Sequence, residues 1–134
     1  MKVIGIRGAV QVKKNTPEII KKASMLMMRK IVSANKIKAE DVACVIFTMT
    51  SDLNTEFPAY AIRDMKKGWE YVPLLCAKEL DVTGSMPRVI RILALVNSDL
   101  SQKDVCHQYL GAAKVLRKDL ANALMRKVNK RVKK

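Results

Sequence analysis

An arginine interrupts an otherwise apolar run in the second half of the sequence. Residues 89–96 read Val-Ile-Arg-Ile-Leu-Ala-Leu-Val, so Arg91 is the one polar side chain in a segment typical of a buried strand. A guanidinium is costly to bury unless an anion meets it. Arg7 repeats the pattern in the first strand-like segment, 2–12, with glycines nearby. Two such arginines predict a pocket for a carboxylate or phosphate ligand.

A polar cluster precedes Arg91, on a segment expected to form a loop between two strands. It contains Cys76, Glu79 and Asp81. Either acid offers Arg91 an ion-pair partner, which would make the arginine part of the fold and not of a site. The residues alone support these two interpretations about equally.

Other chemistry has less support in the sequence. A nucleophile pair of Cys76 with His107 is disfavoured, because no Asn or Asp can be identified to orient the histidine. Packing as a small apolar residue is the alternative for Cys76. One histidine and three cysteines without CxxC spacing predict no metal site.

Strand and helix patterns alternate along the chain, which indicates an α/β or α+β domain. The clearest helix start is Pro17 at the first helical position, with Asn15 or Thr16 as the cap. The expected strands are 2–12, 42–49, 71–75, 89–96 and 113–116, and the expected helices are 17–35, a short one between Pro58 and Gly68, and 101–110.

Length and composition place further limits on the protein. Its 134 residues, 49% of them apolar, fit one globular domain. We expect a cytoplasmic protein without a membrane partner, because no apolar run approaches about 20 residues and the N-terminus lacks signal-peptide features. The odd number of cysteines also favours reduced thiols.

The net charge of +14 is concentrated near the C-terminus. From Lys114 onward nine basic residues face one acid, Asp119, which gives +8. A small nucleic-acid-binding domain is therefore an alternative function. The sequence contains no recognised binding motif and no aromatic residues interleaved on the strands, so we expect no nucleic-acid partner.

A series of short motifs resembles one enzyme family. The motifs run in order, at similar spacing, from about Val3 to Leu120. They are Ile6-Arg7-Gly8-Ala9, Phe57-Pro58-Ala59, Ala61-Ile62-Arg63, Gly68-Trp69, Tyr71-Val72-Pro73, Cys76 with Glu79, Asp81-Val82-Thr83-Gly84, Arg88-Val89-Ile90-Arg91, His107 with Tyr109-Leu110, and Val115-Leu116-Arg117. Together they resemble the monofunctional chorismate mutases of the AroH class. The resemblance implies a chorismate mutase domain over 1–120, followed by a basic tail over 121–134.

The resemblance implies a fold and a reaction. The fold is α+β, a mixed sheet with helices on one face, assembled into a homotrimeric pseudo-α/β-barrel with active sites between subunits. The reaction converts chorismate to prephenate by an intramolecular rearrangement without a cofactor or metal. An enzyme accelerates such a step by holding the reactive conformer and stabilising charge on the ether oxygen.

The resemblance also implies roles for individual residues. Arg91 would contact the ether oxygen and a carboxylate, and Arg7 and Tyr109 would bind the same carboxylate. Glu79 would accept a hydrogen bond from the ring hydroxyl, with Cys76 near that group. The implied lining residues are Phe57, Ala59, Arg63, Leu75, Leu116 and Arg117, of which Arg63 and Arg117 would hold the ring carboxylate.

The sequence departs from the family at three places. Tyr60 stands where a lysine is common, Lys118 replaces a usual proline, and the tail is unusually basic. An outer charge contact at Tyr60 is therefore in question, and the tail lysines are a candidate substitute. Another trimeric enzyme, of the imine-deaminase-like family, is a further alternative, but it leaves the set of Cys76, Glu79 and Arg91 unexplained.

Overall fold

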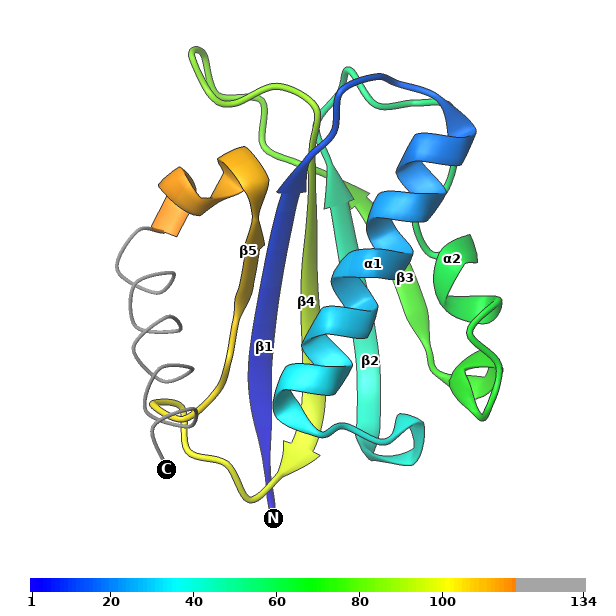
Figure 1. The fold of residues 1–134 in the computed structure, drawn as a ribbon, viewed down its shortest axis with the longest axis vertical. Helices are drawn as coiled ribbons and strands as arrows, with labels where there is room; N and C mark the ends of the chain where they lie inside the picture. The colour runs from blue at the N-terminus through cyan, green and yellow to red at the C-terminus, as the bar shows by residue number, and fades with distance from the viewer. Residues whose placement is uncertain (118–134) are drawn as a thin grey trace.

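A single mixed sheet organises the protein (Figure 1). The computed structural model describes residues 1–117. Within these residues, five strands lie in the order β3-β2-β4-β1-β5. The central strand β4 is antiparallel to β1 and β2, while β5 is parallel to β1 and β3 is parallel to β2. The strands are β1 (Lys2–Gln11), β2 (Val42–Met49), β3 (Leu74–Lys78), β4 (Val89–Ser98) and β5 (Gln108–Leu110).

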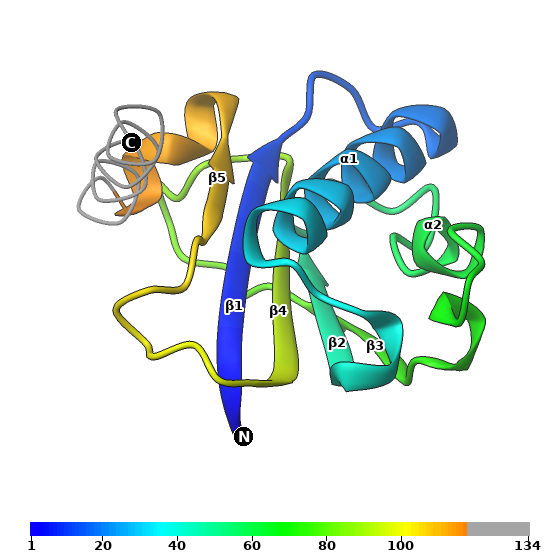
Figure 2. The ribbon, with the colours of Figure 1, turned by 60° about the horizontal axis from the view of Figure 1, so that its bottom comes forward.

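Helices α1 (Pro17–Asn35) and α2 (Tyr60–Arg63) lie beside each other over one face of the sheet (Figures 1 and 2). Thr16 caps α1, because its hydroxyl accepts a hydrogen bond from the backbone N–H of Ile19 at 3.3 Å. Alternate residues of β4 are fully or almost fully buried on this side, as period-two side-chain direction requires. The core formed with α1 includes Ile6, Ile20, Met27, Phe47, Ile90, Ile92 and Val96.

The other face of the sheet, here called the open face, is only partly covered. At one end, the 3-10 helix η3 (Gly111–Arg117) packs Ala113 against Ala9, Val89 and Tyr109. The rest of the open face carries apolar side chains without a covering helix among the described residues. We call this group the apolar patch: Val3, Cys44, Ile46, Leu75, Leu93 and Leu95. Val3 is 57% exposed and Leu75 is 61% exposed, so much of this surface faces water in a single chain.

Two short segments connect the main elements. The 3-10 helix η1 (Ala39–Asp41) leads into β2, and η2 (Trp69–Tyr71) leads into β3. An ion pair of 2.5 Å between Lys21 and Asp64 joins α1 to the residue after α2. The Asp64 carboxylate, which accepts a hydrogen bond from the amine, raises the pKa of Lys21. No helix within residues 1–117 is long and apolar enough to span a bilayer.

The mixed sheet with α-helices on one face confirms that part of the sequence prediction. Three element assignments were wrong. The predicted strand 71–75 begins later, at Leu74, after η2, and the predicted strand 113–116 is part of η3. The predicted division between residues 120 and 121, with Lys118 and the tail, lies outside the described residues.

The predicted helix at 101–110 is also absent, for a local reason. The hydroxyl of Ser101 donates to Asp104 at 2.7 Å, and the N–H of Asp104 donates to the Ser101 carbonyl at 3.0 Å, which closes a turn. Buried Asn35 then donates to the carbonyl of Cys106 at 2.9 Å and accepts from its N–H at 2.8 Å. Both polar groups of Cys106 are thereby satisfied outside a helix, and β5 follows.

Candidate active site

One row across the sheet carries three polar side chains on the open face. The pairing register places Thr48 of β2 opposite Arg91 of β4, Arg91 opposite Ala9 of β1, and Ala9 opposite Tyr109 of β5. Residues opposite each other in neighbouring strands point to the same face. Three separate segments of the chain therefore bring Thr48, Arg91 and Tyr109 to one band of the sheet.

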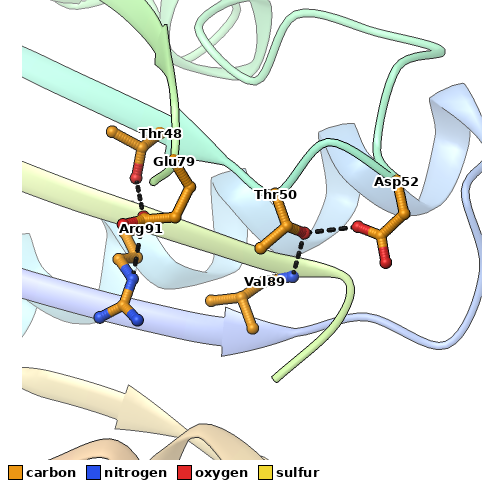
Figure 3. A network of polar contacts seen from close by, with 6 residues as sticks. All are labelled: Thr48, Thr50, Asp52, Glu79, Val89 and Arg91. Carbon is orange, nitrogen blue, oxygen red and sulfur yellow. Dashed lines mark hydrogen bonds and ion pairs between the residues drawn. The ribbon is translucent and has the colours of Figure 1, made fainter. Parts of the chain in front are cut away.

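Glu79 lies between Thr48 and Arg91 (Figure 3). Its Oε2 accepts a hydrogen bond from the Thr48 hydroxyl at 2.5 Å and lies 2.9 Å from Nε of Arg91. The Arg91 and Glu79 side chains are 29% and 22% exposed, so the ion pair is largely but not fully covered. Although the distance is short, the Nε–H of Arg91 does not point at the oxygen, and Nε lacks a hydrogen bond within the described residues. The contact is thus an ion pair of poor hydrogen-bond geometry.

A second network fixes the beginning of β4 beside this pair (Figure 3). The hydroxyl of Thr50 donates to Asp52 at 2.5 Å and accepts from the N–H of Val89 at 3.0 Å. Both oxygens of Asp52 also accept from the N–H of Arg88, at 3.1 and 3.0 Å. Arg88 has φ of 53°, so Asp52 holds a left-handed residue at the turn into β4. Arg91 therefore lies two residues after Val89, whose backbone is held by Thr50.

Arg7 also belongs to the open face. It lies two residues before Ala9 on β1, so its side chain shares the face of Arg91. The guanidinium makes no ion pair or hydrogen bond with the described residues. Its backbone N–H donates to Nδ1 of His107 at 2.9 Å, so His107 helps to hold the start of β5 beside β1. This contact gives His107 a structural role.

Tyr109 completes this group. The side chain is 4% exposed, yet its hydroxyl has no hydrogen-bond partner among residues 1–117. A buried unpaired hydroxyl is unfavourable and often marks a missing ligand or partner. Leu116 packs on the same small cluster as Tyr109, and Arg117 follows it in η3. We call Arg7, Glu79, Arg91 and Tyr109 the open-face group.

The other predicted lining residues gather around α2. The rings of Phe57 and Tyr60 are 5.3 Å apart, and the guanidinium carbon of Arg63 lies 5.0 Å from the centre of the Tyr60 ring. Phe57 is 58% exposed, and Ala59 is buried in the main core. Tyr60 thus holds Arg63 by a cation–π contact. We call Phe57, Tyr60 and Arg63 the α2 group.

The side chains of Cys76 and Leu75 lie on opposite faces of the sheet. Cys76 lies opposite Phe47 and packs against the main core, on the helix side, where it also borders a surface pocket with Phe57. Leu75 lies opposite Ile46 on the open face. The thiol of Cys76 therefore does not join Glu79 and Arg91 within one chain, although its role stays a prediction.

The α2 group and Tyr109 are far apart in a single chain. β3, beside the α2 group, and β5, which carries Tyr109, are the two edge strands (Figures 1 and 2). Neighbouring strands are about 4.8 Å apart, so the edges are separated by about 19 Å. The structure brings Leu116 together with Tyr109 of the open-face group, and keeps Phe57, Ala59 and Arg63 away from Tyr109.

Thr48 is a further residue of this region, one that the sequence did not predict for the site. Its side chain contacts the proposed ring-hydroxyl acceptor directly. The sequence offered only a weak signal, two threonines at alternate positions at the end of an apolar strand. Strands are rich in threonine in general, so this pattern does not indicate a site.

The chemistry available here is binding and charge stabilisation. Within residues 1–117, no group of three or more His, Cys, Asp or Glu side chains is arranged to hold a metal ion. The open-face group offers two guanidinium groups, a phenol and one carboxylate. This set can bind an anion and accept a hydrogen bond from a hydroxyl on the same ligand.

Fold and residues together define a class, an α+β domain whose open face carries two arginines able to bind an anionic ligand. Residues 3–120 match the family described as chorismate mutase type I. The chain therefore belongs to the chorismate mutase type I family.

Named relatives agree with this assignment. The chain is 50% identical to chorismate mutase AroH of Thermus thermophilus over 122 residues, covering 90% of this chain and 98% of the relative. It is 40% identical to chorismate mutase AroH of Bacillus subtilis over 121 residues, covering 90% and 94%. A solved chorismate mutase from Clostridium thermocellum superposes with a TM-score of 0.80 at 39% identity, covering 84% of this chain and 98% of that one.

Proposed function

We propose that the protein converts chorismate to prephenate at a site built by two neighbouring copies of the chain. As a member of its family, the protein is an isomerase of aromatic amino-acid biosynthesis. Chorismate carries two carboxylates, a ring hydroxyl and an enol-pyruvyl ether. Its rearrangement is intramolecular, so the enzyme needs to select a conformer and stabilise developing negative charge on the ether oxygen.

The open-face group supplies one half of the proposed site. Arg91 presents its terminal nitrogens to the ether oxygen and the side-chain carboxylate. Arg7 and the Tyr109 hydroxyl bind the same carboxylate, and Glu79 accepts from the ring hydroxyl. The observation that carries this proposal is the hydroxyl of Tyr109, which is buried on the face that carries Arg7 and Arg91 and has no hydrogen-bond partner within residues 1–117. A substrate carboxylate would satisfy this hydroxyl and engage the terminal nitrogens of Arg91.

The α2 group supplies the other half from a neighbouring chain. Within one chain it is about the width of the sheet away from Tyr109, too far to close a site around one small molecule. The apolar patch supports assembly, because an uncovered apolar surface on a sheet face favours association with another protein surface. A closed homotrimer, in which each open face meets the α2 group of the next chain, gives three equivalent sites.

The thiols support a reducing compartment. Cys44, Cys76 and Cys106 are all free, and disulfides are rare where glutathione keeps thiols reduced. We therefore place the enzyme in the cytoplasm.

Incubation with chorismate tests the proposed activity directly. Loss of the ultraviolet absorbance of chorismate, with prephenate as the product, is the expected result. Arg91→Ala is the matched control, because it removes the guanidinium and leaves the strand. Equal rates for the two proteins would refute the assignment of the site.

A further inference from the structure

We propose that Thr48 is a positioning residue for Glu79, one that keeps the Glu79 carboxylate from occupying the guanidinium that the substrate needs. The inference rests on the proposed function, in which Glu79 accepts from the ring hydroxyl and Arg91 binds the ether oxygen. Thr48 acts on the reaction through Glu79 and does not itself touch the substrate.

The two carboxylate oxygens of Glu79 differ in their contacts. Oε2 is approached from two sides, by the Thr48 hydroxyl at 2.5 Å and by Nε of Arg91 at 2.9 Å. Oε1 has no hydrogen bond or ion pair within residues 1–117. Holding one oxygen from both sides limits rotation of the carboxylate, so that Oε1 is presented for another donor. The ring hydroxyl of the substrate is that donor.

The geometry of the ion pair shows what Thr48 prevents. Carboxylate and guanidinium groups commonly pair through two parallel hydrogen bonds. Here one carboxylate oxygen approaches only Nε, off the line of its N–H, and the terminal nitrogens of Arg91 are turned away from Glu79 (Figure 3). The hydrogen bond from Thr48 holds Oε2 off the direction of the Arg91 Nε–H bond. The terminal nitrogens of Arg91 are therefore left for the substrate.

The position of Thr48 suits this task better than a loop position would. Thr48 and Arg91 are opposite residues of two central strands, so the sheet fixes the distance between them. Glu79 comes after the last residue of β3, and Leu80 next to it is 80% exposed. The backbone of Glu79 is tied to β2 by one hydrogen bond of 3.0 Å, from its N–H to the Met49 carbonyl. The Glu79 side chain therefore needs a hydrogen-bond partner on the sheet to be held in one orientation.

Three substitutions at Thr48 test the role of its hydroxyl. Thr48→Val keeps the shape and removes the donor, and we expect kcat/KM to fall about tenfold, the scale of one hydrogen bond to a charged group. Thr48→Ser restores the donor and should stay within about twofold of the original protein, because the same bond can form. Thr48→Ala provides the same comparison if the valine variant is recovered in low yield.

A double-mutant cycle with Glu79→Ala separates positioning from general stability. When the carboxylate is absent, Thr48→Val should change kcat/KM by less than about twofold, because its hydroxyl has lost its partner. Thr50→Val, one residue after the end of β2, is the matched control. It also removes a hydroxyl that donates to a carboxylate, that of Asp52, so its effect should be the same with or without Glu79.

The outcomes distinguish this inference from the proposed function. Equal losses from Thr48→Val in both backgrounds, or no loss at all, would overturn the positioning role. If Glu79→Ala itself keeps the original kcat/KM, the assignment of Glu79 to the substrate is wrong. An impaired Glu79→Ala with an unaffected Thr48→Val rejects Thr48 alone.

Discussion

In the proposed site, Arg91 serves both the fold and the substrate with one side chain. Its Nε side lies against Glu79, and its two terminal nitrogens remain for the ligand. A lysine provides the charge for the ion pair, but it lacks the planar fork that reaches two ligand oxygens together.

Arg91→Lys should therefore separate activity from stability. We expect turnover to fall by about 10²–10³, as when one preorganised donor to a developing oxyanion is removed. The melting temperature should change little, because a cation still faces Glu79. Turnover at saturating chorismate and thermal unfolding, measured side by side, test this. Near-normal turnover combined with a large drop in melting temperature would make Arg91 a structural residue.

Glu79→Gln should be milder for catalysis. The amide oxygen can still accept from the ring hydroxyl, so we expect kcat/KM to fall by about tenfold, or 1.4 kcal/mol. The melting temperature should fall, because the partly buried Arg91 loses its counter-charge. Arg91→Lys should thus lower turnover much more than stability, whereas Glu79→Gln should lower stability with a smaller loss of activity. A loss of turnover larger than that of Arg91→Lys contradicts the assignment of Glu79 as an orienting acceptor.

The chemical types in the site could be predicted from sequence, but their contacts could not. An arginine in an apolar strand indicated either an anion ligand or an ion pair, and the structure contains the ion pair with Glu79. Which nitrogen faces Glu79 depends on the register of three strands, and no local pattern encodes it. For the same reason, the side chains of Cys76 and Glu79 could not be assigned to different sides of the sheet from sequence.

At the scale of elements, Gly8 sets how closely α1 approaches the sheet. A Cβ atom at this position would lie 3.0 Å from Cδ1 of Ile31 and 3.0 Å from the sulfur of Met27. Both neighbours are fully buried, so they have little room to move.

Gly8→Ala should destabilise the protein through this contact. Overpacking of this kind costs about 1–3 kcal/mol in the free energy of unfolding. In a Met27→Ala background the same substitution should cost less, because the crowded sulfur is gone. Denaturant unfolding of the four proteins of the cycle measures the difference. Equal costs in both backgrounds would show that contact with Met27 is not the cause.

The elements with strong local signals were predictable, and those governed by distant contacts were not. The cap signal at Asn15 or Thr16 and the proline after it predicted the start of α1 correctly, and Thr16 is the cap. The segment after Ser101 has a helix-start pattern as well, but Asn35, far away in sequence, binds both polar backbone groups of Cys106. Such a tertiary contact overrides local propensity, and the pattern alone cannot reveal it.

At the scale of the whole molecule, removing residues 121–134 should spare the chemical step. The family match ends at residue 120, and the removed part contains six basic residues and no acidic one. We expect kcat to stay within about tenfold, or 1.4 kcal/mol. Capture of the doubly charged substrate at low salt should weaken, since exposed charges act over about 10 Å at 0.1 M salt. The measurement is kcat and kcat/KM against salt concentration, and a larger loss of kcat contradicts this prediction.

The apolar patch is the feature from which we expect assembly with other copies of the chain. Leu93 and Leu95 lie at the centre of the open face, on the middle strand of the sheet, and only the end near η3 is covered. Light scattering should therefore give the mass of three chains. Leu95→Asp should lower both the mass and the activity, because a buried carboxylate without a partner is strongly unfavourable. A fully active single chain would refute the assembly.

Mixing two inactive variants tests whether each site uses two chains. Arg91→Ala disables the open-face group, and Arg63→Glu disables the α2 group by repelling the substrate. If one site takes its halves from different chains, some sites in a mixed trimer combine the intact open face of the second variant with the intact α2 group of the first. Random assembly makes about a quarter of the sites intact, so activity should rise toward that fraction after unfolding and refolding together. As a matched control, a mixture of Arg91→Ala with Arg7→Ala should gain no activity. Both changes lie in the open-face group, so every site then contains a damaged half.

Recovery of activity in both mixtures, or in neither, would mean that the two groups do not meet between chains.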